Sequence, residues 1–296
     1  MGINLTSIIV KEVVEFKELR GKHLAIGGTS ELHQSLTLIR KEDATPLTNA
    51  GGNITTSLLA GLFYRTTRLL REYGIRPVLV FDGTPPVIGS SKTTMTSKSA
   101  DPMIEDAKRL LKLLGIPYVE APGDGEAQAA YMAKKGDVWA THSKDYDSIL
   151  FGTPRFVRYL TLSRKGSSQS RFIPSQPEVI DTFRILSHCG ISLKQLIDMA
   201  ILMGTDYNQG IKGIGPKTAL RLIRQYGSLE ELPLEIAEHL PENYQQIREV
   251  FLEPEVTTSY SIDYKRADEE GLYQFLCSER GFAEERVKLV IEGIKG

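Results

Sequence analysis

The sequence predicts an α/β protein in which helices flank a mostly parallel central sheet and a mainly helical part follows. Short apolar runs of strand length, at 22–26, 77–81 and 137–141, alternate with longer segments whose apolar residues recur at helical spacing. Polar or acidic residues follow these runs, and right-handed crossovers would bring the ends of the three strands to one edge of the sheet. Beyond Pro174 the pattern is mainly helical.

The composition is that of an ordinary globular protein. The 296 residues are 41% hydrophobic and 25% charged, which suffices for one large core or two small ones. No run of eighteen apolar residues occurs, so no membrane span is expected. The 36 basic and 37 acidic residues nearly cancel, which argues mildly against nucleic-acid binding, although a balanced sum can hide a basic face. Two cysteines are too few for a disulfide framework, and an intracellular location is expected.

The first strand and the two helices after it contain few residues that suggest a functional site. The run at 22–26 leads through a glycine turn into a helix for which Thr29 and Ser30 serve as the cap. A second helix begins at about Thr55 and carries an apolar stripe, and Arg65 lies largely off that stripe. A solvated helix face is the general explanation for such an arginine.

The run at 77–81 suits a central parallel strand, and Asp82 follows it directly. Open α/β sheets place their ligands at this position, past the carboxyl end of a strand. A turn-forming Asp-Gly pair explains Asp82 equally well when it is taken alone. The segment 87–101 is polar without periodicity and is predicted to be a surface loop, and a helix is expected from about Pro102 to Leu114.

Four further carboxylates stand where the apolar framework stops. Asp124 and Glu126 open a predicted helix, and capping of that helix is the simplest explanation of each. Asp145 and Asp147 follow the strand at 137–141 within six residues. Capping does not explain why the pattern repeats. We therefore expect these carboxylates to converge on one cleft and to hold hard divalent cations.

The stretch 210–220, with the sequence GIKGIGPKTAL, predicts a helix-hairpin-helix element. Its Gly-Ile-Gly turn precedes a helix that opens with Pro216, and free backbone N–H groups at such a helix start suit a phosphate. Lys217 and Arg221 add positive charge on that helix, as do the nearby Lys212 and Arg224. The alternative is a simple packing unit of two helices and a turn.

Together these stretches resemble the flap endonucleases, the XPG-type structure-specific 5′ nucleases with a PIN-like fold, over nearly the whole chain. The stretches that carry the resemblance are Phe63-Tyr-Arg-Thr, Val80-Phe-Asp-Gly-Thr-Pro-Pro86, Gly115-Ile-Pro-Tyr-Val-Glu-Ala-Pro122, Gly125-Glu-Ala-Gln-Ala129, Tyr131-Met-Ala-Lys-Lys-Gly-Asp-Val-Trp139, Asp145-Tyr-Asp147, Met203-Gly-Thr-Asp-Tyr207, Gly213-Ile-Gly-Pro-Lys217 and Phe251-Leu-Glu-Pro-Glu-Val256. The resemblance implies one 5′ nuclease domain over 1–296. Its expected parts are 1–101 with a shortened arch loop at 87–101, 102–180 with the acidic site, a helix-hairpin-helix subdomain at 181–260 and C-terminal helices at 261–296.

The resemblance also implies a centre of two Mg²⁺ ions, replaceable by Mn²⁺, that hydrolyses DNA at junctions of single and double strands. Its expected ligands are Asp82, Asp124 and Glu126 for the first ion. The expected residues around the second ion are Asp145, Asp147 and Asp206, and the same six acids are the expected catalytic residues. Contacts to DNA are expected from Gly2, His33, Arg65, Gly213, Gly215, Lys217 and Arg221.

This chain departs from the family pattern at several positions. Gly27 stands where the family has an aspartate, and Asp124 stands where it has a longer glutamate. The family has a longer, basic arch that threads the 5′ strand. The segment 87–101 stands in its place and holds only two lysines. His33 occupies the place of an aromatic residue that stacks on a base. The chain ends at Gly296 without the clamp-binding tail typical of the family, so recruitment by a sliding clamp is not inferred.

Two functions follow as hypotheses. The first is a monomeric, metal-dependent 5′ nuclease of replication and repair, with reduced activity on flaps, gaps or overhangs. The second is a catalytically inactive protein that binds DNA junctions. The six carboxylates favour the first, because a mere binder gains nothing from packing like charges together, whereas Gly27 and the short arch favour the second. A globular α/β domain with incidental acidic loops is the third reading of the chain.

Overall fold

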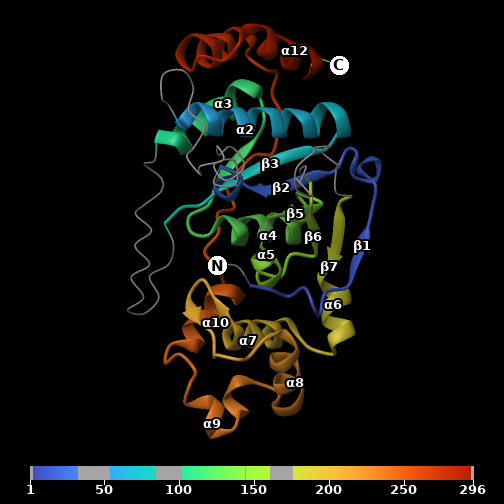
Figure 1. The fold of residues 1–296 in the computed structure, drawn as a ribbon, viewed down its shortest axis with the longest axis vertical. Helices are drawn as coiled ribbons and strands as arrows, with labels where there is room; N and C mark the ends of the chain where they lie inside the picture. Colours follow the sequence, from blue (N-terminus) through green and yellow to red (C-terminus); the bar gives the residue numbers. More distant parts are fainter. Residues whose placement is uncertain (1–2, 33–53, 85–101, 144, 161–175, 295–296) are drawn as a thin grey trace, which may run out of the picture.

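A seven-stranded sheet forms the centre of the molecule. The computed structural model describes residues 3–32, 54–84, 102–143, 145–160 and 176–294. The strand order is β1-β7-β6-β5-β2-β3-β4 (Figure 1). Among the described residues the strands of this sheet are β1 Lys11–Val13, β2 His23–Gly27, β3 Arg76–Phe81, β4 Tyr118–Glu120, β5 Ala140–His142, β6 Arg155–Arg158 and β7 Glu178–Asp181.

Parallel pairing dominates this sheet, as the sequence predicts. The pairs β2–β3, β2–β5, β3–β4 and β5–β6 are parallel, whereas β7 runs antiparallel to both of its neighbours. The carboxyl ends of β2, β3, β4, β5 and β6 therefore lie at one edge. Side chains that directly follow these strands therefore lie at that edge.

Helices cover both faces and form the lower part of the molecule. The described helices are α2 Ile54–Arg68, α3 Pro102–Leu114, α4 Gly125–Lys135, α5 Asp147–Leu150, α6 Thr182–Cys189, α7 Leu193–Met203, α8 Pro216–Tyr226, α9 Leu234–Ala237, α10 Tyr244–Leu252, α11 Glu269–Leu272 and α12 Glu284–Ile294. Short 3₁₀ or π segments are η1 Phe16–Leu19, η2 Leu69–Tyr73, η4 Leu229–Glu231 and η5 Tyr273–Glu279.

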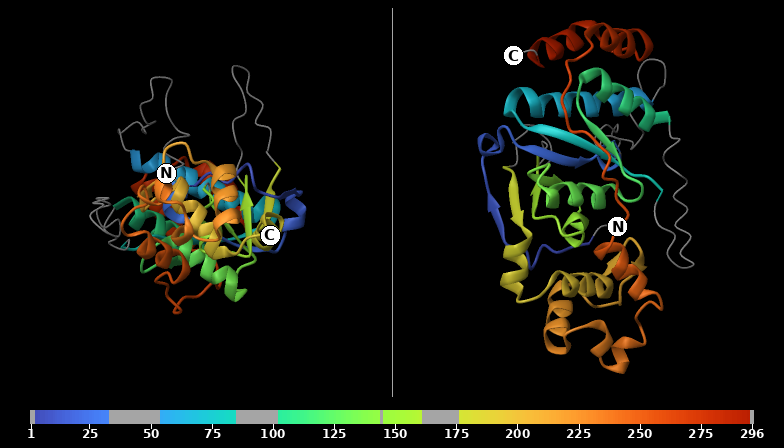
Figure 2. Two further views of the ribbon diagram at one scale, coloured as in Figure 1. Left: turned by 90° about the horizontal axis from the view of Figure 1, so that it is seen from below. Right: turned by 180° about the vertical axis from the view of Figure 1, so that it is seen from behind.

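The layers are visible in side view. Helices α2 and α3, with α12 beyond them, cover one face of the sheet, and α4 covers the other (Figures 1 and 2). A second core joins the N-terminal segment and α5 to the lower helices α7, α8 and α10. Apolar burial of this extent is the main stabilising term of such a fold.

An extended segment, 253–268, returns from the lower helices to the upper layer (Figure 2). The fully buried side chain of Gln128 on α4 holds it by accepting from Thr257 N at 2.7 Å and donating to Thr257 O at 3.0 Å. Further along, Tyr264 donates its hydroxyl to Pro77 O at 2.6 Å. These bonds tie the lower helical part to the sheet.

Several boundaries differ from those the sequence predicts. The first helix begins at Gly28 rather than after Thr29 and Ser30. The strand expected at 137–141 is Ala140–His142, because Gly136 caps α4 with φ 84° and the residues after it complete that turn. The strand expected at 155–160 ends at Arg158, since Tyr159 adopts φ 59°. Four strands were not predicted: β1, β7 and the two short strands of the hairpin described below.

No single helix of the described residues is long and apolar enough to cross a membrane. The bent pair α6 and α7 passes that test on length and composition alone.

Two adjacent glycines at the end of β2 offer a matched test of packing. A Cβ on Gly28 would lie 2.8 Å from the ring of Phe81, which is buried, whereas a Cβ on Gly27 would meet only Ser30, at 3.6 Å. We expect Gly28→Ala to lower the free energy of unfolding by about 1–2 kcal/mol and Gly27→Ala to leave it almost unchanged. Urea denaturation of both variants measures this difference, and equal stabilities would show that the Phe81 ring yields freely.

Candidate acidic active site

Six acidic side chains gather at the carboxyl edge of the sheet and on the helices below it. Asp82 directly follows β3, and Asp124 and Glu126 begin α4 after β4. Asp145 and Asp147 follow β5, the latter as the first residue of α5. Asp206 comes from the lower part, in the turn between the short strands β8 Gly204–Thr205 and β9 Asn208–Gln209. The sequence predicts five of these placements from strand ends, and the hairpin supplies the sixth.

The start of α4 fixes Asp124 and Asp82. Asp124 is the N-cap of the helix, where its Oδ1 accepts from Glu126 N at 2.7 Å and from Ala127 N at 3.2 Å. Asp82 Oδ1 accepts from Gly125 N at 2.9 Å. A Cβ on Gly125 would lie 2.6 Å from that oxygen, so only glycine permits the approach. Asp124 therefore both caps α4 through Oδ1 and faces the other acids through Oδ2, which lies outside the cap.

Two serines hold Glu126, and the sequence analysis missed both. Ser143 donates its hydroxyl to Glu126 Oε1, and Ser148 donates to Oε2 at 3.1 Å. The hydroxyl of Ser143 also accepts from Asp145 N at 3.4 Å. Ser143 directly precedes the acidic motif and was visible as a polar neighbour, whereas Ser148 becomes recognisable only when α5 is placed against α4.

The N-terminal segment and the β8–β9 hairpin supply the remaining contacts. Ile3 N donates to Asp147 Oδ1 at 3.1 Å. The hydroxyl of Tyr207 donates to Asp124 Oδ2 at 3.4 Å, and the ring of Tyr207 packs edge-on against Phe251 of α10. The acidic site is thus built from both the sheet and the lower helices.

Burial and neighbouring negative charge raise the pKa of three of these carboxylates. Burial first, and then the charges of Asp82 and Asp206, raise the pKa of Asp124 to about 6. Burial raises the pKa of Asp147 to about 7, with further contributions from Asp206, Asp145 and Asp124. Burial and the charges of Asp147 and Asp124 raise the pKa of Glu126 well above its ordinary value, against the bonds from the serines. The six acids therefore form one electrostatically connected group.

The donors of this group suit a hard cation. All are carboxylate oxygens, which is the chemistry that Mg²⁺ prefers, and burial raises the pKa of Asp124 and of Asp147 above the ordinary range of a carboxyl group. Within the described residues, however, no three or more His, Cys, Asp or Glu side chains come together as a site that could hold a metal by themselves. Mg²⁺ typically binds through one or two carboxylates and takes its other ligands from water and phosphate, so the residues fit such an ion.

Gly27 ends β2 beside Val80, two residues before Asp82. It contributes no oxygen, although the space near it would accept a side chain. The next acid along the chain, Glu31, does not replace it. Its carboxylate pairs with Arg65 at 2.8 Å and lies 3.6 Å from His142 Nε2, and these two groups lower the pKa of Glu31 although burial alone would raise it.

That pairing also accounts for Arg65. Its side chain is mostly buried against Glu31 rather than solvated on a helix face, which corrects the general expectation from the sequence. Two of the residues for which DNA contacts are expected, Gly2 and His33, lie outside the described residues, as does the arch loop at 87–101.

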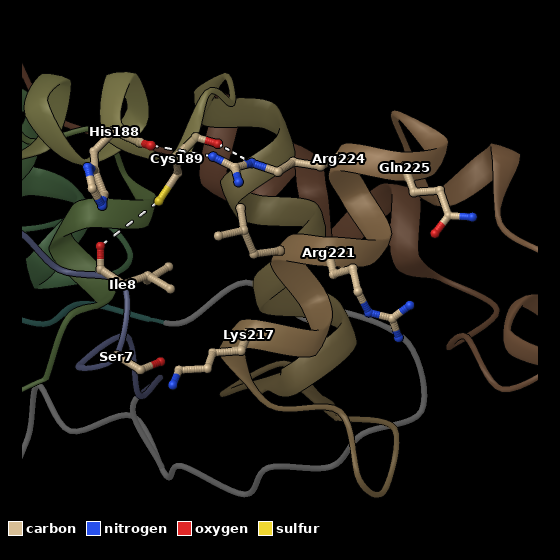
Figure 3. Close-up of a pocket in the computed structure, with 9 residues that line it drawn as sticks. Ser7, Ile8, His188, Cys189, Lys217, Arg221, Arg224 and Gln225 are labelled. Carbon is tan, nitrogen blue, oxygen red and sulfur yellow. Dashed lines mark hydrogen bonds between the residues drawn. The ribbon is translucent and has the colours of Figure 1, made fainter.

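A separate basic site surrounds the start of α8. Gly215 is the N-cap and makes no side-chain bond, Pro216 is the first helical residue, and Gly213 has φ 88°. The first-turn N–H groups are thus left free by the cap, as phosphate binding requires. Lys217 and Arg221 are exposed on one side of α8, beside a groove of about 660 Å³ that reaches Ser7 (Figure 3).

Arg224 has a different role from the one its charge suggests. Its Nε donates to Cys189 O at 2.6 Å and its Nη2 to His188 O at 3.4 Å (Figure 3). These carbonyls end α6, where a cation is favourable. Arg224 therefore caps a helix and joins α6 to α8, while Lys217 and Arg221 remain on the surface.

The chain matches two family models, the XPG N-terminal domain over residues 1–101 and the XPG I-region over residues 115–206. It is 45% identical to Flap endonuclease 1 of Methanopyrus kandleri, over 100% of this chain and 94% of that protein. Among solved structures, flap endonuclease-1 from Methanococcus jannaschii matches with a TM-score of 0.84 and 41% identity, covering 99% of this chain and 98% of that one. The Holliday junction-resolving enzyme GEN1 in complex with product DNA and Mg²⁺ matches with a TM-score of 0.66 and 23% identity, over 96% of this chain and 75% of that one, which is a likeness of fold.

The raised pKa values predict a pH-dependent response to Mg²⁺. Folding penalises the ionised form of an acid whose pKa rises on folding, so the metal-free protein should lose stability as pH increases from about 4 to about 7. A bound cation removes the penalty. We therefore expect Mg²⁺ to raise Tm by at least about 3 °C more at pH 8 than at pH 5, measured by calorimetry.

Asp147→Asn is the control for this measurement. Without metal it should raise Tm at about pH 8 and flatten the pH dependence, because it removes one of the repelling charges. It should also weaken the response to Mg²⁺. Equal Mg²⁺ responses at both pH values would contradict the view that these carboxylates repel one another in the folded protein.

Proposed function

The chain belongs to the flap endonuclease family of XPG-type nucleases, and from this we propose that it is a structure-specific 5′ nuclease that hydrolyses DNA phosphodiester bonds at junctions of single and double strands. The observation that carries the proposal is the connected group of six carboxylates at the carboxyl edge of the sheet. Such a concentration of carboxylates, several of them buried, destabilises the folded protein when they are ionised, and a bound cation offsets that cost. Its presence is therefore best explained by metal-dependent chemistry.

We propose Mg²⁺ as the cation, with two ions at the site and Mn²⁺ as a substitute. Asp82, Asp124 and Glu126 would hold the first ion, and Asp145, Asp147 and Asp206 would surround the second. When bound, such a pair activates water and stabilises both the attacking and the leaving oxygen of an in-line displacement. The GEN1 structure with Mg²⁺ supports this choice.

The protein's own groups orient these ligands. The cap of α4 occupies Oδ1 of Asp124 and leaves Oδ2 directed toward Tyr207, so Asp124 offers one oxygen. Both oxygens of Glu126 accept from serine hydroxyls, which fixes the plane of the carboxylate. Locked ligands of this kind reduce the reorganisation that binding would otherwise require.

The start of α8 supports a grip on duplex DNA. Free N–H groups behind Gly213 and Gly215, together with the exposed Lys217 and Arg221, suit phosphates and carry no sequence information. Contacts to DNA by Gly2, His33 and Arg65 stay proposals. We expect the protein to act inside the cell as a monomer in DNA replication and repair, without a role for a membrane.

A second candidate, an inactive protein that binds DNA junctions, is favoured by Gly27. Glycine removes one carboxylate from the end of β2, and Glu31 is held elsewhere by Arg65 and His142. The helix-hairpin-helix grip does not depend on this loss. Cleavage separates the two candidates.

We expect the chain as written to cut an end-labelled 5′-flap duplex slowly in Mg²⁺ or Mn²⁺. The variant Gly27→Asp should cut at least about tenfold faster, because it adds a carboxylate at the end of β2, the strand that pairs with β3 before Asp82, where a Cβ has room. Gel analysis of the products under single-turnover conditions measures both rates. Asp147→Asn, added to Gly27→Asp, is the control and should abolish cleavage.

The possible outcomes separate the hypotheses. Cleavage by the chain as written establishes an enzyme that works with the remaining six carboxylates. Cleavage by Gly27→Asp alone makes the natural chain a junction binder on a nuclease scaffold. If neither protein cuts, the nuclease proposal fails and the arch segment becomes the next site to alter.

The grip of α8 is tested by binding rather than by cleavage. The double variant Lys217→Ala and Arg221→Ala should bind a blunt duplex more weakly. The slope of log K against log salt should fall in magnitude by about 1–2, because fewer counterions are released when fewer phosphates are neutralised. Lys288→Ala is the matched control, as it removes an exposed cation from α12 at the opposite end of the molecule. An unchanged slope in the double variant would remove α8 from the account of DNA binding.

A further inference from the structure

Tyr159 has a backbone conformation that tyrosine rarely adopts. Its φ of 59° is the only positive φ of a non-glycine residue in the part of the chain that the structure describes. The left-handed region costs such a residue about 1–3 kcal/mol, whereas glycine or asparagine adopts it at less cost. A bulky aromatic ring at this position therefore needs a compensating reason.

Burial does not provide that reason. The side chain of Tyr159 is 38% exposed, while the neighbouring Tyr146 is 5% exposed and belongs to the core. The ring instead packs on the guanidinium of Arg158, whose Cζ lies 4.8 Å from the ring centroid. The strained backbone thus presents an aromatic ring to solvent with a cation beside it.

Arg158 is itself held in place. Its Cζ lies 4.5 Å from the ring centroid of Tyr146, and its Nη1 donates to the hydroxyl of Tyr146. In the sheet, Arg158 pairs with Glu178 of β7. The guanidinium is therefore fixed between two tyrosine rings, which orders the exposed ring as well.

The position of this stack connects it to the acidic site. Strand β6 is parallel to β5, so Arg158 and Tyr159 leave the sheet at the same edge as the acids that follow β5. Tyr146 stands between Asp145 and Asp147 in the chain. The exposed ring of Tyr159 is thus separated from the acidic motif by one guanidinium and one buried ring.

We propose that Tyr159 is a stacking platform for an unpaired base of the DNA, next to the acidic site. The inference rests on the proposed function in that DNA is the ligand, but it does not require cleavage. An exposed aromatic ring takes any base by its π-face, and such stacking contributes about 1–3 kcal/mol per base. Preorganisation of the ring by Arg158 lowers the entropy lost when the base binds. The subsite favours DNA that carries a single strand over blunt duplex.

Three variants test the platform by binding. Tyr159→Asn removes the ring and keeps a residue that tolerates φ 59°, Tyr159→Phe keeps the ring, and Tyr64→Ala removes a comparably exposed tyrosine from α2. We expect Tyr159→Asn to bind oligothymidylate and a 5′-flap duplex about tenfold more weakly, with blunt-duplex binding and Tm preserved. The other two variants should bind all three ligands as the natural chain does.

Photocrosslinking gives a positive readout in the natural chain. A flap with 5-iododeoxyuridine at successive positions should form a crosslink to Tyr159, located by mass spectrometry of the digested protein. The crosslink should persist when cleavage is blocked by Asp147→Asn.

The inference is overturned if the natural chain shows no binding of single-stranded or flap DNA, if Tyr159→Asn binds the flap as well as the natural chain does, or if it loses flap and blunt duplex equally. Flap cleavage with an unchanged rate and affinity in Tyr159→Asn would reject the platform and leave the nuclease proposal standing. If the natural chain does not cleave a flap, but Tyr159→Asn binds flap DNA more weakly while binding blunt duplex normally, the nuclease proposal is rejected and the platform is supported.

Discussion

The burial and mutual repulsion of carboxylates at one edge of the sheet are the constraint on which the rest of the molecule depends. Burial and neighbouring charge raise the pKa of Asp124 to about 6 and that of Asp147 to about 7, so the site resists the ionised state in the absence of cations. A flexible chain would relieve this repulsion by separating the acids. The fold prevents it, because each acid begins a helix, ends a strand or occupies a tight turn.

The contacts that hold the acids come from parts of the chain distant in sequence. Gly125 allows α4 to approach Asp82, and Ile3 N binds Asp147 across most of the N-terminal half. Tyr207 brings the β8–β9 hairpin to Asp124, and its ring rests on Phe251 of the helix that leads into the returning segment. The lower helices are thus both part of the acidic site and the support for the basic surface on α8.

Glycine at position 27 is compatible with this arrangement. The strand still pairs with β3 and β5 through its backbone, and Gly28 still fits against Phe81. The scaffold and the chemistry are therefore separable in this chain. A Cβ at position 27 has room, so we expect that an acid can be added there without rebuilding the site, and the proposed DNA grip of α8 does not involve this position.

The sequence by itself determined the parallel strands, the capped helices and five of the six acid positions, because apolar periodicity and strand ends are local signals. It also determined the start of α8, where Gly215 and Pro216 act on their own neighbours. Only the tertiary structure decided that Arg65 pairs with Glu31, that Arg224 caps α6, and that Ser148 and Tyr207 bind the acids. It also set the antiparallel strands β1 and β7, whose short, partly exposed sequences carry little pattern. These contacts join residues far apart in the chain, and their partners are selected by packing rather than by sequence spacing.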